Sequence, residues 1–242
     1  MLSSELVEAL RAAKHIVAST GAGISAESGV PTFRDAQTGL WSQFRPEELA
    51  TPEAFLRHPK RVWDWYAGRR ELVGRAEPNP GHRALVALED KVPKFTLITQ
   101  NVDGLHRRAG SRNVIELHGN ILQTKCFAEN TLVSAWEDRG ETPPRCPECN
   151  GLLRPNVVWF GEPLPVNALE QALVASRTCD VFLSIGTSTE VAPAASLPFE
   201  ALAAGSTIVE INRDSTRLTG QAQHVLRGLA GEILPLLAEA LG

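Results

Sequence analysis

The chain has 242 residues, which suits one large domain or a large domain carrying a small insert. Hydrophobic residues make up 43% of it and charged residues 21%, so a sizeable core is expected and disorder is not. The formal net charge of -4 excludes a bulk electrostatic grip on nucleic acid, and no specific nucleic-acid partner is expected.

Two further classes of protein are disfavoured. No run of about 18 apolar residues occurs, so no membrane-spanning helix is expected. Residues 1–5 lack a basic region followed by an apolar run, which is unlike a secretory signal and predicts a cytoplasmic protein. Three of the four cysteines cluster at positions 126, 146 and 149, and in such a chain a cluster favours metal over disulfides.

Short apolar runs alternate with helical patterns along the chain. A helix over 5–14 is expected to lead directly into a buried strand over 15–20. Further strands are expected over 95–99, 114–118, 181–185 and 207–211. Further helices are expected over 81–90, 167–177, 194–204 and 230–241. This alternation predicts an α/β fold, in which helices cover both faces of a parallel sheet.

Two segments break the alternation. Residues 31–80 are rich in Pro, Trp and Arg, and residues 120–160 hold the clustered cysteines. We expect a single domain in which both segments build a smaller lobe. Its large lobe would comprise approximately residues 1–31, 80–119 and 160–242, and its small lobe approximately residues 32–79 and 120–159.

A glycine-rich turn follows the first expected strand, where residues 21–29 read GAGISAESG. Glycines at a strand-to-helix turn let backbone N–H groups approach a phosphate, and a helix N-terminus favours negative charge. The spacing is G-x-G without a third glycine at the usual place. A turn that binds no ligand therefore stays the alternative.

Polar turns follow three other strands. Residues 99–106 read TQNVDGLH, and their amides and carboxylate suit an amide and a ribose. The alternative is a helix start capped by Asn101 or Asp103. The hydroxyl groups of 186–188 and the polar residues 212–214 suit the phosphate and ribose of a dinucleotide, although turns favour the same residue types.

A histidine ends another strand. Strand alternation places Val114, Glu116 and His118 on one face and Ile115 and Leu117 on the other. A histidine at a strand end, followed by glycine, can face an open cleft and accept a proton near neutral pH. A structural histidine is the alternative.

The clustered cysteines suggest a metal site. Cys126-x-x-Glu129 and the pair Cys146 and Cys149 resemble two zinc-binding pairs, with one cysteine of the first pair absent. Three thiolates and the Glu129 carboxylate would make a closed, structural Zn²⁺ site. A metal-free or partly occupied site is the alternative.

Together these segments resemble the sirtuin family, over nearly the whole chain and in the same order. The matching pieces are GAGISAESGVPTFR at 21–34, TQNVDGLH at 99–106, ELHG at 116–119, CPECNGLLRPNVVWFGE at 146–162, GTS at 186–188 and IN at 211–212. The resemblance implies a Rossmann-like large domain and a small zinc-bearing lobe. It also implies a deacylase that consumes NAD as a co-substrate and acts on acyl-lysine proteins, releasing nicotinamide and an O-acyl-ADP-ribose.

The resemblance also implies residue roles. His118 matches the catalytic base, Gln100 and Asn101 match residues at the ribose and the reacting centre, and Ile24 and Asp103 match the nicotinamide pocket. The phosphate and cofactor loop is matched by Gly21, Ala22, Gly23, Ser25, Phe33 and Arg34. The adenosine side is matched by Gly186, Thr187, Ser188 and Asn212.

Substrate selection is implied by a second match. Tyr66 and Arg69 share a face if residues 61–71 are helical, and they look like the Y-x-x-R of class III sirtuins, which accept malonyl- and succinyl-lysine. A guanidinium pairs bidentately with such a carboxylate. The alternative is a solvated arginine stacked on Trp63 or Trp65.

The protein substrate is expected to lie extended between the lobes. Residues 156–162 resemble the strand and F-G-E turn that pair with substrate backbone in this family, which assigns Val158 and Phe160 to substrate binding. An ordinary core strand is the alternative. Competing functions are a mono-ADP-ribosyltransferase, a non-catalytic NAD-binding sensor and a zinc-ribbon adaptor. No oligomeric state is predicted.

Overall fold

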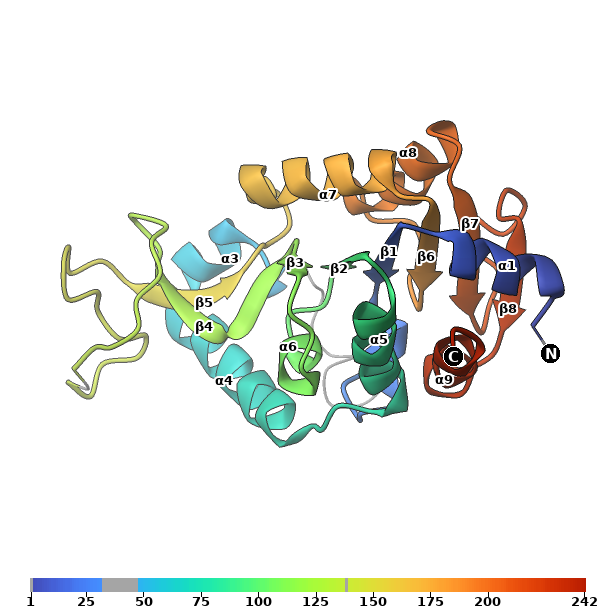
Figure 1. The fold of residues 1–242 in the computed structure, drawn as a ribbon. Coiled ribbons are helices and arrows are strands. Elements are labelled where there is room, and N and C mark those ends of the chain that lie inside the picture. The colour runs from blue at the N-terminus through green and yellow to red at the C-terminus, as the bar shows by residue number, and fades with distance from the viewer. Residues whose placement is uncertain (1, 32–47, 138) are drawn as a thin grey trace.

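A computed structural model describes residues 2–31, 48–137 and 139–242 (Figure 1). Its main sheet has six parallel strands in the order β3-β2-β1-β6-β7-β8. These strands are β1 His15–Thr20, β2 Lys94–Thr99, β3 Val114–Glu116, β6 Val181–Ile185, β7 Thr207–Asn212 and β8 His224–Arg227. The parallel sheet with covering helices confirms the predicted fold class.

Helices cover both faces of this sheet. They are α1 Ser4–Ala12, α2 Ala22–Ala26, α5 Pro80–Lys91, α6 Leu105–Ala109, α7 Val166–Thr178, α8 Leu197–Ala203 and α9 Ala230–Ala240. In Figure 1, α7 and α8 lie on one face, and α5 and α9 lie on the other. Val114 joins the core on the α5 and α9 side, whereas Ile115 and Leu117 join the core beneath α7 and α8, so the predicted alternation is confirmed.

Two predicted elements differ from the observed ones. The strand predicted over 114–118 ends at Glu116, so Leu117 and His118 lie beyond its end. The helix predicted over 194–204 is a 3-10 turn, Ala194–Ser196, followed by α8. Proline at the start of α8 explains this break, because it is favoured in a first helical turn and lacks the N–H that continues a helix.

A second unit flanks the sheet. It contains α3 Pro52–Arg57, α4 Pro59–Arg75 and an antiparallel pair, β4 Gly119–Cys126 and β5 Leu153–Val157. Its own core contains Phe55, Val62, Tyr66 and Trp159. The helix expected over 61–71 is therefore part of α4, with Tyr66 on the buried face. The lobe boundaries stay a prediction.

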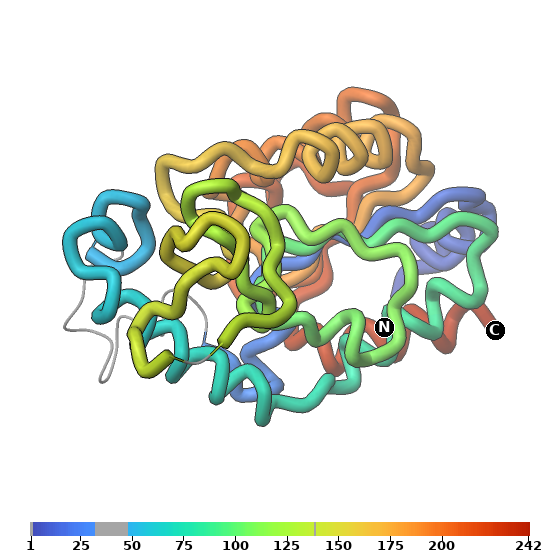
Figure 2. The backbone as a smooth tube through the Cα atoms, turned by 90° about the vertical axis from the view of Figure 1, so that its left-hand side faces the viewer, coloured from blue at the N-terminus to red at the C-terminus, as the bar shows by residue number. Residues whose placement is uncertain are grey.

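Both marked ends of the chain lie in the right-hand half of Figure 2. The first and last helices are joined there, since the Arg11 guanidinium of α1 donates two hydrogen bonds to the carbonyl oxygen of Ala240 in α9, at 3.0 and 2.8 Å. Within the described part of the chain, no helix combines the length and the apolar character needed to cross a membrane.

Candidate functional site

Four loops meet at one edge of the sheet. Because β1, β2, β6 and β7 are parallel neighbours or near neighbours, their carboxyl ends lie at the same edge. Three of these strands are followed by polar or glycine-rich residues: the turn beginning at Gly21, the pair Gln100 and Asn101, and the turn beginning at Gly186. The fourth strand, β7, ends at Asn212.

Glycines allow two of these loops to touch through their backbones. The Gly23 N–H donates to the Gly186 carbonyl oxygen at 2.9 Å, and Gly186 has a positive φ of 58°. A Cβ atom at Gly23 would lie 2.7 Å from the Gly186 Cα, and one at Gly21 would lie 2.9 Å from the Thr187 Cβ. Side chains at these positions would therefore push the two loops apart.

Asn101 ties the β2 end to the glycine turn. Its Nδ2 donates to the Gly21 carbonyl oxygen and to the Ser25 hydroxyl, both at 3.0 Å. Asn101 is only 8% exposed, so these bonds fix its amide in one orientation.

Thr187 joins the other two loops. Its hydroxyl accepts a hydrogen bond from Gln100 Nε2 at 3.2 Å, and its carbonyl oxygen accepts one from Asn212 Nδ2 at 2.9 Å. Ser188, the next residue, is half-buried. The structure thus brings together the predicted residues from β2, β6 and β7.

A cavity of about 170 Å³ opens beside these loops. It is lined partly by Gly23, Gly186, Asn212, Gly228 and Leu229, so it lies between the glycine turn and the start of α9. The polar amides and the glycine backbones make a surface that suits a dinucleotide. Phe33 and Arg34, predicted to bind the same ligand, lie outside the described residues.

Asp103 is almost fully buried beside the site. Its carboxylate accepts a hydrogen bond from the Leu105 N–H at 2.9 Å and another from the Ser25 hydroxyl. Burial raises the pKa of this carboxyl, and the two hydrogen bonds oppose the rise. The N-cap of α6 is Gly104, which makes no side-chain cap, so Asp103 is not the helix cap considered as the alternative, although it accepts from the first N–H of the helix.

Ile24 lies differently from its neighbours. Its side chain has 0% exposure and belongs to the core on the α5 and α9 side, while Ala22, two residues earlier, is half-buried. Any contact of Ile24 with a ligand stays a prediction.

His118 lies between β3 and β4. Its Nδ1 is 2.9 Å from the carbonyl oxygen of Gln100, which can only accept, so Nδ1 carries the proton and Nε2 keeps a lone pair. Burial lowers the pKa of the imidazole, and the bond to Gln100 partly opposes this. The ring is therefore neutral at pH 7 and able to accept a proton.

A buried polar network under the site was missed by sequence reasoning. The Thr20 hydroxyl donates to the Thr99 hydroxyl and lies 2.9 Å from His106 Nε2, while Thr99 Oγ1 accepts from the Asn101 N–H at 3.0 Å. The His106 ring packs at a tilt against the His82 ring, with centroids 4.8 Å apart. Only the register between β1 and β2 brings these groups together.

Tyr66 and Arg69 lie one helical turn apart on α4. The Tyr66 hydroxyl accepts a hydrogen bond from Trp159 Nε1 at 2.9 Å. The Arg69 guanidinium stacks over the Trp65 ring, with its Cζ 4.8 Å from the centroid. Burial raises the pKa of Tyr66 to about 12 and lowers that of Arg69. The stacking on Trp65, which belonged to the alternative considered for Arg69, is therefore observed, although the side chain is partly buried and not fully solvated.

The segment after β5 is hydrogen-bonded to His118 and to the residues that precede α3. The Val158 N–H donates to the His118 carbonyl oxygen, and the Phe160 N–H donates to the Ala50 carbonyl oxygen, both at 2.9 Å. These two N–H groups are therefore already used within the chain. Val158 is half-buried and Phe160 is 46% exposed.

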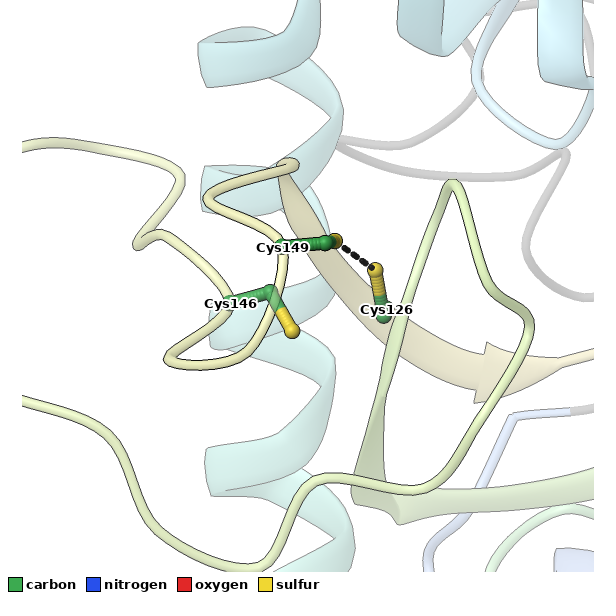
Figure 3. A group of neighbouring side chains, drawn as sticks. All are labelled: Cys126, Cys146 and Cys149. Atoms are coloured by element: carbon green, nitrogen blue, oxygen red, sulfur yellow. Dashed lines mark hydrogen bonds between the residues drawn. The ribbon is translucent and has the colours of Figure 1, made fainter.

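Three cysteine sulfurs converge at the far end of β4 and β5 (Figure 3). The sulfurs of Cys126, Cys146 and Cys149 lie within 4.8 Å of one another. Tetrahedral zinc with bonds of about 2.3 Å places its sulfurs roughly 3.8 Å apart, so the spacing fits. Gly151 leaves the room that the cluster needs, since a Cβ there would meet the Cys149 Sγ at 3.2 Å.

Glu129 does not complete this cluster. Its side chain is exposed and is not among the grouped ligands, although its N–H donates to the Cys126 Sγ at 3.5 Å. The three thiols fit three of the four positions of a structural Zn²⁺ site, and the described residues group no fourth His, Cys, Asp or Glu with them.

Comparison with known proteins gives consistent results. Residues 21–193 match the model of the Sir2 family. A relative from Aquifex aeolicus, named NAD-dependent protein deacylase, is 55% identical over 85% of this chain and 86% of its own length. A relative of the same name from Pyrococcus abyssi is 50% identical over 96% of this chain and 94% of its own length.

Solved structures lead to the same family. A Sir2 homolog–NAD complex is 47% identical, covers 100% of this chain and 94% of its own, and superposes with a TM-score of 0.92. A Sir2–p53 peptide–NAD⁺ complex is 34% identical, covers 99% and 98% of the two chains, and gives a TM-score of 0.87. The matched family model, the near-complete relatives and the shared fold place this chain in the Sir2 family.

Proposed function

We propose that this Sir2-family chain, an NAD-dependent protein deacylase, removes acyl groups that end in a carboxylate, namely succinyl and malonyl groups, from lysine side chains. One observation carries the proposal. Arg69 is a partly buried cation one helical turn after Tyr66 on α4, and no carboxylate of the described residues forms an ion pair with it.

The chemistry of this pair selects a terminal carboxylate. A guanidinium presents a planar fork of N–H donors that matches a carboxylate, and the Tyr66 hydroxyl offers one more donor. A partly desolvated charge without a partner costs free energy, which a succinyl or malonyl group relieves. A plain acetyl group leaves that charge unpaired and is therefore disfavoured.

The strand-end residues supply the reaction centre. NAD, consumed as a substrate, would provide the ribose carbon that the acyl oxygen attacks and the nicotinamide that leaves. We assign proton acceptance to Nε2 of His118, because Nδ1 is occupied by the Gln100 carbonyl oxygen. Asn101 and the glycine turn would hold the ribose and phosphates, and the buried Asp103 would border the nicotinamide.

Protein substrates are supported by the relatives' name and by the peptide bound in one solved neighbour. The segment from Val158 to Phe160 is the proposed binding edge. Because the N–H of Val158 already bonds to His118, its carbonyl oxygen is the group left for an extended peptide.

The test uses one peptide sequence carrying succinyl, malonyl or acetyl lysine, with and without NAD, analysed by mass spectrometry. Arg69→Met is expected to lower kcat/KM for the succinyl peptide about 10- to 100-fold relative to the acetyl peptide, because a hydrogen bond to a charged group contributes about 1.5–3 kcal/mol. Arg75→Met is the matched control, since Arg75 lies on the same helix, is 79% exposed and, among the described residues, forms an ion pair with Glu71 alone.

Equal loss of succinyl and acetyl activity in Arg69→Met would contradict the proposed selectivity. Nicotinamide release without an acylated peptide would favour the mono-ADP-ribosyltransferase alternative. NAD binding without consumption would favour the sensor.

A further inference from the structure

Trp159 lies two residues past the end of β5, between the peptide segment and the α4 helix. It is 2% exposed, and its indole N–H donates to the Tyr66 hydroxyl oxygen at 2.9 Å. The flanking residues Val158 and Phe160 belong to the proposed peptide-binding edge. Trp159 therefore connects that edge to the side chain proposed to read the acyl group.

The bond from Trp159 determines what the Tyr66 hydroxyl can do. A phenol has one hydrogen to donate and a lone-pair side that accepts. Because Trp159 occupies the accepting side, the hydroxyl hydrogen is directed elsewhere. Burial raises the pKa of Tyr66 to about 12, so the hydroxyl keeps its proton at any physiological pH and stays a donor.

The Trp159 ring is itself held on several sides. The Arg154 guanidinium lies over it, with Cζ 3.2 Å from the ring centroid, and Phe55 packs at 5.3 Å between centroids. Arg154 forms a salt bridge with Glu162, and Glu162 Oε2 also accepts the Trp159 N–H of the backbone at 2.7 Å. The indole N–H is thus fixed in direction, as an orienting donor requires.

We propose that Trp159 is a positioning residue for acyl specificity, whose indole N–H turns the Tyr66 hydroxyl toward the terminal carboxylate of the acyl group beside Arg69. This inference rests on the proposed function, in which Tyr66 and Arg69 bind that carboxylate. It assigns the preference to a residue that need not touch the substrate.

The test replaces the N–H and keeps the ring. Trp159→Phe retains an aromatic face for Arg154, and benzothienylalanine at position 159 retains the bicyclic shape with sulfur in place of N–H. For both, kcat/KM for the succinyl peptide is expected to fall about tenfold relative to the acetyl peptide, mainly through KM, as for one hydrogen bond to a charged group. A purely structural role would lower both activities equally.

A double substitution tests whether Trp159 acts through the Tyr66 hydroxyl. Tyr66→Phe removes the hydroxyl that Trp159 orients, so adding Trp159→Phe to it should change the succinyl-to-acetyl ratio by less than about twofold. Multiplying losses in the double variant would overturn the inference. Equal losses for both peptides, or no change in either, in both position-159 variants would also overturn it.

The same assay separates this inference from the proposed function. If Arg69→Met shifts the succinyl-to-acetyl ratio and neither position-159 variant does, only the role of Trp159 fails. If the unmodified chain shows no preference for the succinyl peptide and Arg69→Met leaves the ratio unchanged, the proposed function fails and the inference falls with it.

Discussion

At the scale of single residues, the proposed role of His118 as the base predicts how the reaction rate depends on pH. Its Nδ1 proton is held by the Gln100 carbonyl oxygen, and burial lowers the pKa of the ring below 6.5. We expect kcat/KM to be constant at neutral pH and to fall with acidification, approaching about tenfold per pH unit well below the lowered pKa, where the base is protonated. Steady-state kinetics between pH 5 and 8 would measure this profile.

Substitutions of two histidines test whether His118 is the base. His118→Ala is expected to abolish NAD-dependent deacylation while the far-UV circular dichroism spectrum is retained. His224→Ala, at the start of the edge strand β8 and away from the carboxyl ends, should keep turnover. Activity retained in His118→Ala would remove the assigned base.

The sequence pattern predicted which residues would lie together at the candidate site, but not which hydrogen bonds they would form. Gln100, Asn101 and Gly186 follow apolar runs, and parallel strands bring such positions to one edge. The contacts of Thr20 with Thr99 and His106 depend on strand register, which one sequence does not reveal.

At the scale of elements, a metal bound by the cysteine cluster is expected to hold β4 and β5 together in addition to their hydrogen bonds. Zinc bound by Cys126, Cys146 and Cys149 would crosslink segments far apart in the sequence. Chelation is therefore expected to lower the Tm, by roughly 2–4 °C for each kcal/mol of lost stability in a chain of this size. Metal analysis and calorimetry, before and after chelation, would measure the effect.

Substitutions distinguish the ligands of this site from their neighbours. Cys149→Ser should lower the bound zinc and the Tm. Glu129→Gln should change neither, because that carboxylate is exposed and lies outside the sulfur cluster. Zinc lost from Glu129→Gln would show that the carboxylate is a ligand after all.

The strands that are continuous apolar runs could be predicted from the sequence, whereas the half-exposed edge strand and the burial of a charged residue could not. The bounds of β1 and β6 match the predicted ones because every residue in them is buried. The strand β8 was missed because it is short and half-exposed at the sheet edge. In β5, Arg154 is buried through its salt bridge with Glu162, which its own type does not predict.

At the scale of the whole molecule, buried neutral histidines make the stability depend on acidity. Burial lowers the pKa of His82 from 6.5 to about 4, so the unfolded chain binds this proton at pH values where the folded chain does not. Stability should therefore fall as pH drops through 6.5 and level off near 4, by roughly 3 kcal/mol for this residue. His82→Gln removes the titrating imidazole. It keeps an acceptor for the hydrogen bond that the Asn79 N–H donates to His82 Nδ1. Denaturation from pH 4.5 to 7.5 should give a shallower slope for His82→Gln, and an unchanged slope would show that His82 is not the titrating group.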